Sequence, residues 1–172
     1  GHLYLTRKGI RPYGLHIMDK GDAARLLVPL RVGGELVSLQ FIGADGSKRF
    51  MTGGRVQGAH CAIGELSGTP PVLVVCEGFA TGASIHETTG LPVAVAFNAG
   101  NLKAVAQALR EKMPAAKIIV AADDDVNTED NPGLTKAREA AQAVGGLLAV
   151  PDFGAERPQD VSDFNDLHQL AD

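Results

Sequence analysis

Acidic side chains that could hold a metal ion stand just after the apolar runs of this sequence. They are Glu77, Asp123, Asp125, Asp163 and Asp166. Glu77 directly follows the run 72–76, and the pair Asp123 and Asp125 directly follows the run 117–122. Carboxylates gathered in one place repel each other strongly unless a cation lies between them. The spacing therefore indicates a site for a cation.

The chemistry of such a site is metal-assisted phosphoryl transfer. Because residues two apart in an extended segment point the same way, Asp123 and Asp125 can face one ion while Asp124 turns aside. Hard oxygen ligands suit Mg²⁺ or Mn²⁺, which proteins usually bind through a few carboxylates and the phosphates of a substrate. Ions held in this way can stabilise both the attacking and the leaving oxygen of the transfer.

Other interpretations of the acidic residues are weaker. A single carboxylate at a strand end is more often a helix cap or a solvated loop residue than a metal ligand. Three acidic clusters after successive predicted strands favour a metal site instead. An EF-hand that starts at Asp123 fails, because Thr128 stands where glycine is required and Leu134 where glutamate is required. The sequence also lacks the GxxxxGK(S/T) and GxGxxG phosphate-binding motifs.

The second half of the chain alternates strands and helices. The expected strands are 72–76, 92–97, 117–122 and 147–150. The expected helices are 81–89, 102–112, 134–144 and a last one for which Ser162 is the expected N-cap. This alternation predicts an α/β fold with a mainly parallel, Rossmann-like sheet flanked by helices. Ligands gather at the carboxyl ends of the strands in such sheets, which is where the acidic residues fall.

The first part of the chain has the pattern of a small antiparallel β unit. The expected strands are 26–31, 35–42 and 48–52, with glycine-containing turns between them. Along the second of these, Val37, Leu39 and Phe41 alternate with more polar positions, which predicts one apolar face. The sequence Thr69-Pro70-Pro71 indicates a boundary. We therefore expect a small β-rich subdomain over 1–69 and an α/β domain over 70–172.

The two parts carry opposite net charge. Residues 1–60 hold nine basic and four acidic side chains, whereas residues 61–172 hold seven basic and sixteen acidic ones. A basic part can hold a polyanion while an acidic part gathers metal ions, although an uneven distribution of solvated charges is the simpler alternative. Lys48, Arg49 and Arg55 cluster near a predicted strand and are the leading candidates for phosphate contacts.

Composition excludes several classes of protein. With 45% hydrophobic and 21% charged residues, the chain is expected to be globular. Its longest apolar runs have five residues, far fewer than the roughly 20 that a membrane-spanning helix needs, so no membrane partner is expected. Two cysteines cannot build a disulfide framework, and we expect a reducing, cytoplasmic compartment.

The acidic motifs resemble those of a known family. Glu77 after one apolar strand, Asp123-x-Asp125 after another and a later Asp163 in Asp-Phe-Asn-Asp resemble the Toprim domain of bacterial primases, type IA and type II topoisomerases and certain nucleases. The segments CEGFATGASIHETTG, PVAVAFNAGNL and IIVAADDD are similar to the version in plasmid- and phage-encoded DNA primases. The front segments LLVPLR and SLQFIGADGSKRFMTGG are also similar to the region that precedes Toprim in those primases.

The resemblance implies a role for each acidic residue. Glu77 matches the catalytic Toprim glutamate, which acts in acid–base or metal chemistry. Asp123 and Asp125 match the metal-binding DxD pair, which is also catalytic. Asp163, together with Asp166, matches the third acidic position that primases add to the metal site.

Two features depart from the family pattern. The DxD is commonly followed closely by a glycine, whereas here Gly133 comes only after the insertion 126–132. The zinc-ribbon and helicase domains often attached to such primases, which are possible partners, are absent from these 172 residues. We therefore expect an excised fragment or a stripped-down relative, and its activity alone is an open question.

The implied function is priming of DNA replication. A DNA primase makes an RNA primer on a single-stranded DNA template from nucleoside triphosphates, with Mg²⁺ or Mn²⁺ as cofactor, and is a nucleotidyltransferase. One alternative is a Toprim-type metal-dependent nuclease, and another is a nucleic-acid- or nucleotide-binding module that is inactive without missing domains. A topoisomerase needs a strand-cleaving tyrosine, and Tyr4 and Tyr13 both lie outside the expected α/β core.

Overall fold

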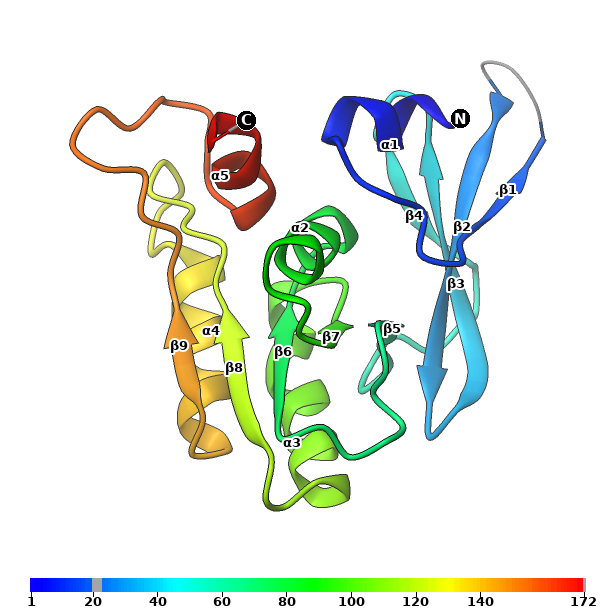
Figure 1. The fold of residues 1–172 in the computed structure, drawn as a ribbon. Coiled ribbons are helices and arrows are strands. Elements are labelled where there is room, and N and C mark those ends of the chain that lie inside the picture. The colour runs from blue at the N-terminus through cyan, green and yellow to red at the C-terminus, as the bar shows by residue number, and fades with distance from the viewer. Residues whose placement is uncertain (20–22, 172) are drawn as a thin grey trace.

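The computed structural model describes residues 1–19 and 23–171, and it contains two β-sheets (Figure 1). The front sheet is antiparallel and follows a short helix, α1 (Leu3–Lys8). Its strands, in spatial order, are β1 (His16–Met18), β2 (Arg25–Val32), β3 (Glu35–Gly43) and β4 (Lys48–Phe50). The expected antiparallel unit is therefore confirmed, and α1 and β1 extend it. The charges counted above that lie outside the described residues are Lys20, Asp22 and Asp172.

The second sheet is mixed and carries the helices. Its strands, in spatial order, are β5 (Cys61–Ile63), β7 (Val93–Val95), β6 (Val72–Cys76), β8 (Lys117–Ala121) and β9 (Leu147–Ala149). Its helices are α2 (Phe79–Thr89), the 3₁₀ turn η2 (Ala99–Asn101), α3 (Leu102–Lys112), α4 (Pro132–Ala143) and α5 (Phe164–Ala171). All strands but the edge strand β5 run parallel, which confirms the predicted sheet. No helix in the described parts of the chain is long and apolar enough to cross a membrane.

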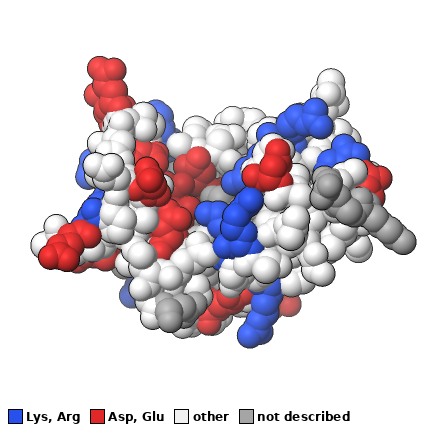
Figure 2. All heavy atoms as spheres, turned by 90° about the horizontal axis from the view of Figure 1, so that it is seen from above, with Lys and Arg blue, Asp and Glu red and all other residues white. Residues whose placement is uncertain are grey.

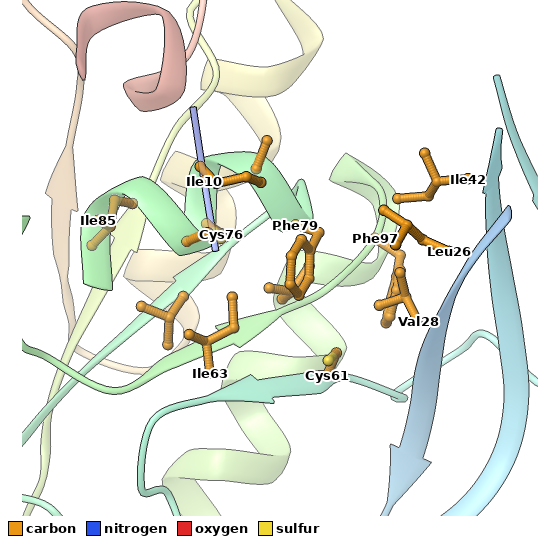
Figure 3. Packing of buried hydrophobic residues seen from close by; sticks show 14 of the residues in the cluster. Ile10, Leu26, Val28, Ile42, Cys61, Ile63, Cys76, Phe79, Ile85 and Phe97 are labelled. Atoms are coloured by element: carbon orange, nitrogen blue, oxygen red, sulfur yellow. The ribbon is translucent and has the colours of Figure 1, made fainter. Parts of the chain in front are cut away.

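Both faces of the second sheet are covered. Helices α3 and α4 cover one face, where Leu73, Val75 and Ile118 are fully buried. The other face packs against α2 and the inner face of the front sheet, so that Phe79 and Leu26 belong to one hydrophobic cluster (Figure 3). Strands buried on both faces are apolar along their whole length, which is why the sequence revealed them.

The buried face of β3 is not its more apolar face. Ser38, Gln40 and Ile42 are buried, whereas the alternate positions from Val37 to Phe41 are only half-buried. The cause is the register with β2, which sets Leu26 directly opposite Ile42. Directly opposite residues point to the same side of a sheet. Because β2 turns Leu26, Val28 and Leu30 inward, β3 must bury the positions that face them.

The two sheets are tied together between residues 55 and 63. Arg31 and His60 exchange two backbone hydrogen bonds, of 2.9 and 3.0 Å, which join β2 to this stretch. The side chain of the buried Asn101 donates hydrogen bonds to two carbonyl groups of the same stretch, at 3.1 and 3.0 Å. Strand β5 then enters the second sheet, although it precedes the expected boundary. The division of the chain at residue 69 stays a prediction.

Candidate active site

A small pocket of about 90 Å³ lies where β6 and β8 end and faces the front sheet. Its lining residues are Lys8, Lys48, Glu77, Gly78, Ala80, Thr81, Phe97, Asp123 and Asp163. Seen from above, acidic side chains lie beside basic side chains at the centre of the molecule (Figure 2). The pocket thus brings together three of the five predicted acidic residues and sets two lysines among them.

Glu77 enters the pocket at the end of β6. Its backbone is held in place because the Phe97 N–H donates a 2.8 Å hydrogen bond to the Glu77 carbonyl oxygen. Burial of the Glu77 carboxyl, and after it the negative charge of Asp125, raise the pKa of this group, while the Lys48 ammonium opposes the rise. Glu77 therefore keeps a proton more readily than an exposed glutamate does.

Asp123 lies in an unfavourable electrostatic environment. Its side chain is half-buried, and its buried Oδ1 atom has no hydrogen-bond partner in the described structure. Burial, followed by the charges of Glu77, Asp163 and Asp125, raises the pKa of Asp123 to about 8. A buried oxygen without a partner is costly, so a cation at this position would stabilise the carboxylate.

The neighbouring Asp124 turns away, as expected. Its Oδ1 atom accepts a 2.7 Å hydrogen bond from the side chain of Asn131, and its Oδ2 atom pairs with the Arg157 guanidinium. The Oδ1 atom of Asn131 in turn accepts a 2.8 Å hydrogen bond from the Asp125 N–H. Asn131 thus fixes the orientation of the DxD segment from the N-terminus of α4. An asparagine before a proline at a helix start is a sequence signal that could have revealed it.

Gly133 packs against the DxD segment, although the insertion 126–132 separates the two in the sequence. A Cβ atom added at Gly133 would lie 2.5 Å from the Asp123 carbonyl oxygen and 2.8 Å from Asp125 Oδ2. No other residue type fits there without displacing the DxD segment. The first turn of α4 therefore packs directly on the backbone of the two aspartates.

Asp163 and Asp166 together cap α5. Asp163 Oδ1 accepts hydrogen bonds from the backbone N–H groups of Asn165 and Asp166, at 2.8 and 2.9 Å. Asp166 Oδ2 accepts from the N–H groups of Ser162 and Asp163, at 2.9 and 3.3 Å, which completes a capping box. The capping side chain is thus Asp163, and the expectation of Ser162 was wrong. Asp163 also lines the pocket, whereas Asp166 does not.

The three basic candidates of the front unit do not form one patch. Lys48 lines the pocket, while Arg49, the next residue of β4, lies opposite Phe41 on the other face of the front sheet. The Arg55 Nε–H donates a 2.9 Å hydrogen bond to the Gln57 carbonyl oxygen. The ring of Phe50 packs edge-on against Phe97, with ring centroids 6.0 Å apart, and fixes β4 beside the pocket.

Lys8 is a pocket residue that the sequence did not reveal. It is the last residue of α1, which ends at Gly9 with a left-handed φ of 64°. A glycine just after a run with basic residues in its last turn is a helix-end signal, and it could have placed Lys8 at a C-terminus. No local sequence pattern predicts that Lys8 lies in one pocket with acidic residues more than 60 positions away.

The donor set suits a hard cation that is completed by other ligands. In residues 1–19 and 23–171, no three His, Cys, Asp or Glu side chains are arranged to hold a metal ion by themselves. Mg²⁺ is usually bound through one or two carboxylates, with waters and substrate phosphates as the remaining ligands. The unpartnered Asp123 oxygen, beside Glu77 and Asp163 in the same pocket, fits that manner of binding.

The comparisons with known proteins agree with this geometry. The family model of the Toprim domain matches residues 72–171, which include all five acidic candidates. DNA primase TraC from Escherichia coli is 36% identical over 156 residues, which cover 87% of this chain and 15% of the relative. The chain thus spans a small part of the curated relative that it matches.

Two solved structures share the fold. They are the catalytic core of DnaG and the catalytic domain of DnaG primase bound to ssDNA. Each has a TM-score of 0.62, with 15% and 14% identity, and each matches 97% of this chain, corresponding to 67% and 66% of the solved chains. The fold is therefore that of a primase catalytic core. The chain belongs to the Toprim domain family.

Proposed function

We propose that this chain is the Toprim catalytic part of a DNA primase, which adds ribonucleotides to a primer on a single-stranded DNA template. The observation that carries the proposal is the pocket in which the unpartnered Asp123 oxygen lies with Glu77 and Asp163 and with Lys8 and Lys48. Acidic and basic groups together can hold a metal–triphosphate complex, which carries both kinds of charge. The relative named DNA primase TraC supports the same class of reaction.

The metal that we propose is Mg²⁺ or Mn²⁺, held by Asp123, Asp125 and Asp163 together with the phosphates of the nucleotide. When bound, such an ion neutralises charge on the triphosphate and stabilises the attacking and leaving oxygens. Asp166 acts in this proposal through the capping box that holds Asp163, with which it exchanges hydrogen bonds.

The side chains around the metal would bind the nucleotide and move a proton. Glu77, with its raised pKa, is suited to accept the proton of the primer 3′-hydroxyl. Lys8 and Lys48 would donate charge-assisted hydrogen bonds to the triphosphate oxygens. The first turn of α2 also borders the pocket and has no side-chain cap, so its N–H groups are available to an anion.

The template would lie along the front unit. Lys48 would contact phosphate at the pocket, and Arg49 and Arg55 would contact the strand outside it. One of the solved DnaG structures was determined with ssDNA, which supports a single strand as the partner. The two buried free cysteines are in keeping with the reducing cytoplasm in which we place the reaction.

A primer-extension assay tests the proposal. The chain is incubated with single-stranded DNA, labelled ribonucleotides and Mg²⁺ or Mn²⁺, and the products are separated on a gel. We expect labelled products that depend on template and metal and that disappear in the double variant Asp123→Asn/Asp125→Asn. Shortening of the DNA without labelled products would instead support the Toprim nuclease.

Binding without turnover would support the remaining alternative, a nucleic-acid- or nucleotide-binding module. If the chain binds nucleotide and DNA but neither extends nor cleaves, it is a binding module that needs further domains for catalysis.

A topoisomerase is not supported by the two tyrosines. Neither tyrosine is placed for strand cleavage, because Tyr4 is buried and the Tyr13 hydroxyl donates a 3.0 Å hydrogen bond to Glu87. Neither one lines the pocket.

A further inference from the structure

The C-terminal end of α1 is completed by side chains of α5. A helix leaves its last carbonyl groups without partners in its own backbone. In α1, the Leu5 and Thr6 carbonyls accept hydrogen bonds from the N–H groups that follow the helix. The Arg7 carbonyl accepts a 2.8 Å hydrogen bond from the side-chain amide of Gln169. The Lys8 carbonyl accepts a 2.8 Å hydrogen bond from the side-chain amide of Asn165.

Asn165 is the buried member of this contact. Its side chain has no exposed surface, and the same Nδ2 atom also donates a 3.0 Å hydrogen bond to the Ser84 hydroxyl of α2. The orientation of its amide group follows from its partners, because a carbonyl oxygen can only accept a hydrogen bond. The Asn165 side chain therefore joins α1, α2 and α5, although Asn165 lies 157 residues after Lys8 in the sequence.

Two of the helices that Asn165 joins, α1 and α5, each deliver a charged group to the pocket. Lys8 ends α1, and Asp163 begins α5 as its N-cap, and both line the pocket. A further contact joins α1 to α5, since Lys8 Nζ lies 3.8 Å from Asp166 Oδ1. The backbone contact fixes where the Lys8 side chain starts, and the acidic contact limits where its ammonium group can go.

We propose that Asn165 is a positioning residue for nucleotide binding, and that it acts through Lys8. The proposal rests on the proposed function, in which Lys8 binds the triphosphate. With Asn165 and Gln169 in place, α1 is anchored at its C-terminus, and Lys8 is held at the pocket with its ammonium 3.8 Å from Asp166 Oδ1. Without them, the end of α1 loses two of its hydrogen bonds and Lys8 no longer stays at the pocket.

A double-mutant cycle separates this role from a merely structural one. The probe is mant-ATP with excess Mg²⁺, and its Kd for the 172-residue chain is measured by fluorescence anisotropy. Lys8→Ala should weaken binding roughly tenfold, as expected for the loss of a charge-assisted hydrogen bond. Asn165→Ala should weaken it by about fivefold in the parent and leave Kd unchanged in the Lys8→Ala background.

A second variant and a control distinguish the positioning role from an effect of misfolding. Gln169 is exposed, so Gln169→Ala should fold normally, weaken mant-ATP binding in the same direction by a smaller factor and have no effect in the Lys8→Ala background. Ser84→Ala removes the other acceptor of Asn165 but keeps the contact to Lys8. It should lower Tm and leave Kd at the parent value.

Each outcome decides between the two proposals. If the parent does not bind mant-ATP, the proposed function is contradicted, and the role of Asn165 with it. If the parent binds but Lys8→Ala has no effect, or if Asn165→Ala and Gln169→Ala weaken binding equally in both backgrounds, the positioning role is contradicted and the proposed function stands.

Discussion

Asp123 and Glu77 both have a raised pKa in the pocket, and burial is the largest cause of each shift. The negative charge of Glu77 raises the pKa of Asp123 further, and the charges of Asp125 and Asp163 raise the pKa of Glu77. Lys48 lowers the pKa of both groups but does not remove the conflict. A metal bound here would replace the proton on Asp123, so proton and metal binding at this carboxylate exclude each other.

The first prediction follows from the raised pKa of Asp123, which lies near 8 in the folded chain and far lower in the unfolded chain. Between these values the folded chain holds a proton that the unfolded chain has lost, so stability falls as the pH rises toward 8. Asp123→Asn has no carboxyl group at this position, so it removes this loss of stability. In EDTA, we expect the variant's gain in Tm to be larger at pH 8 than at pH 5, by roughly 5 °C. An equal gain at both pH values would contradict the burial of this charge.

The second prediction concerns Glu77, which could serve only to end β6 and open α2. A carboxylate near a helix N-terminus contributes about 0.3–1 kcal/mol to stability. Acid–base assistance typically contributes about 10²–10⁴-fold to a rate. Glu77→Gln should therefore melt within a few degrees of the parent, bind single-stranded DNA normally and lose nearly all metal-dependent extension. The exposed Glu139→Gln is the matched control, and equal extension rates for the two variants would make Glu77 a structural residue.

At the level of elements, α4 positions the DxD segment through Gly133. The third prediction is that Gly133→Ala destabilises the chain by about 1–3 kcal/mol, because its Cβ would overlap the Asp123 carbonyl. Relief of the overlap should displace Asp125 and weaken Mg²⁺-dependent nucleotide binding. Gly68→Ala is the control, since its nearest neighbour would be 3.9 Å away. Unfolding midpoints and mant-ATP affinity measure both effects, and a Gly133→Ala chain that matches the control would rule out this packing role.

The pleat of β4 separates two basic residues that are adjacent in sequence. The fourth prediction is that Lys48→Ala weakens mant-ATP binding about tenfold, whereas Arg49→Ala leaves it unchanged. In single-stranded DNA binding, loss of Arg49 or Arg55 should each reduce the slope of log K against log salt by about 0.7. A slope that stays constant in the Arg49→Ala/Arg55→Ala chain would mean that these two charges are solvated.

Elements with strong local signals could be predicted, and contacts between distant elements could not. The apolar strand before Glu77 and the helix 102–112 were evident because burial on one or both faces leaves a clear pattern. The separation of Lys48 and Arg49 also follows from the two-residue period of a strand. The position of Lys8 beside Asp163 depends instead on Asn165, whose partner no local pattern identifies.

At the scale of the whole molecule, the pocket exists only because two sheets share a core. Its lysines come from the front unit and its carboxylates from the α/β unit. Leu26 and Val28 of the front sheet lie in one cluster with Phe79 of α2 and Ile63 of β5 (Figure 3). Removal of either unit would expose this apolar surface to water. The two parts should therefore unfold together, in spite of their different architectures.

Asn101 provides the test of that cooperativity. Its side chain is buried and binds four backbone groups of different segments, including the Gly58 N–H at 2.7 Å and the Ala96 carbonyl at 2.9 Å. Asn101→Ala leaves these groups without partners, at a cost of about 1–3 kcal/mol, or a fall in Tm of several degrees. We expect one transition that coincides in circular dichroism and calorimetry, for the parent and for the variant alike. Asn127→Ala, at an exposed asparagine, should change Tm by little. A separate early transition in Asn101→Ala would show that the front unit unfolds by itself, and the lysine side of the pocket would then be a mobile partner of the acidic side.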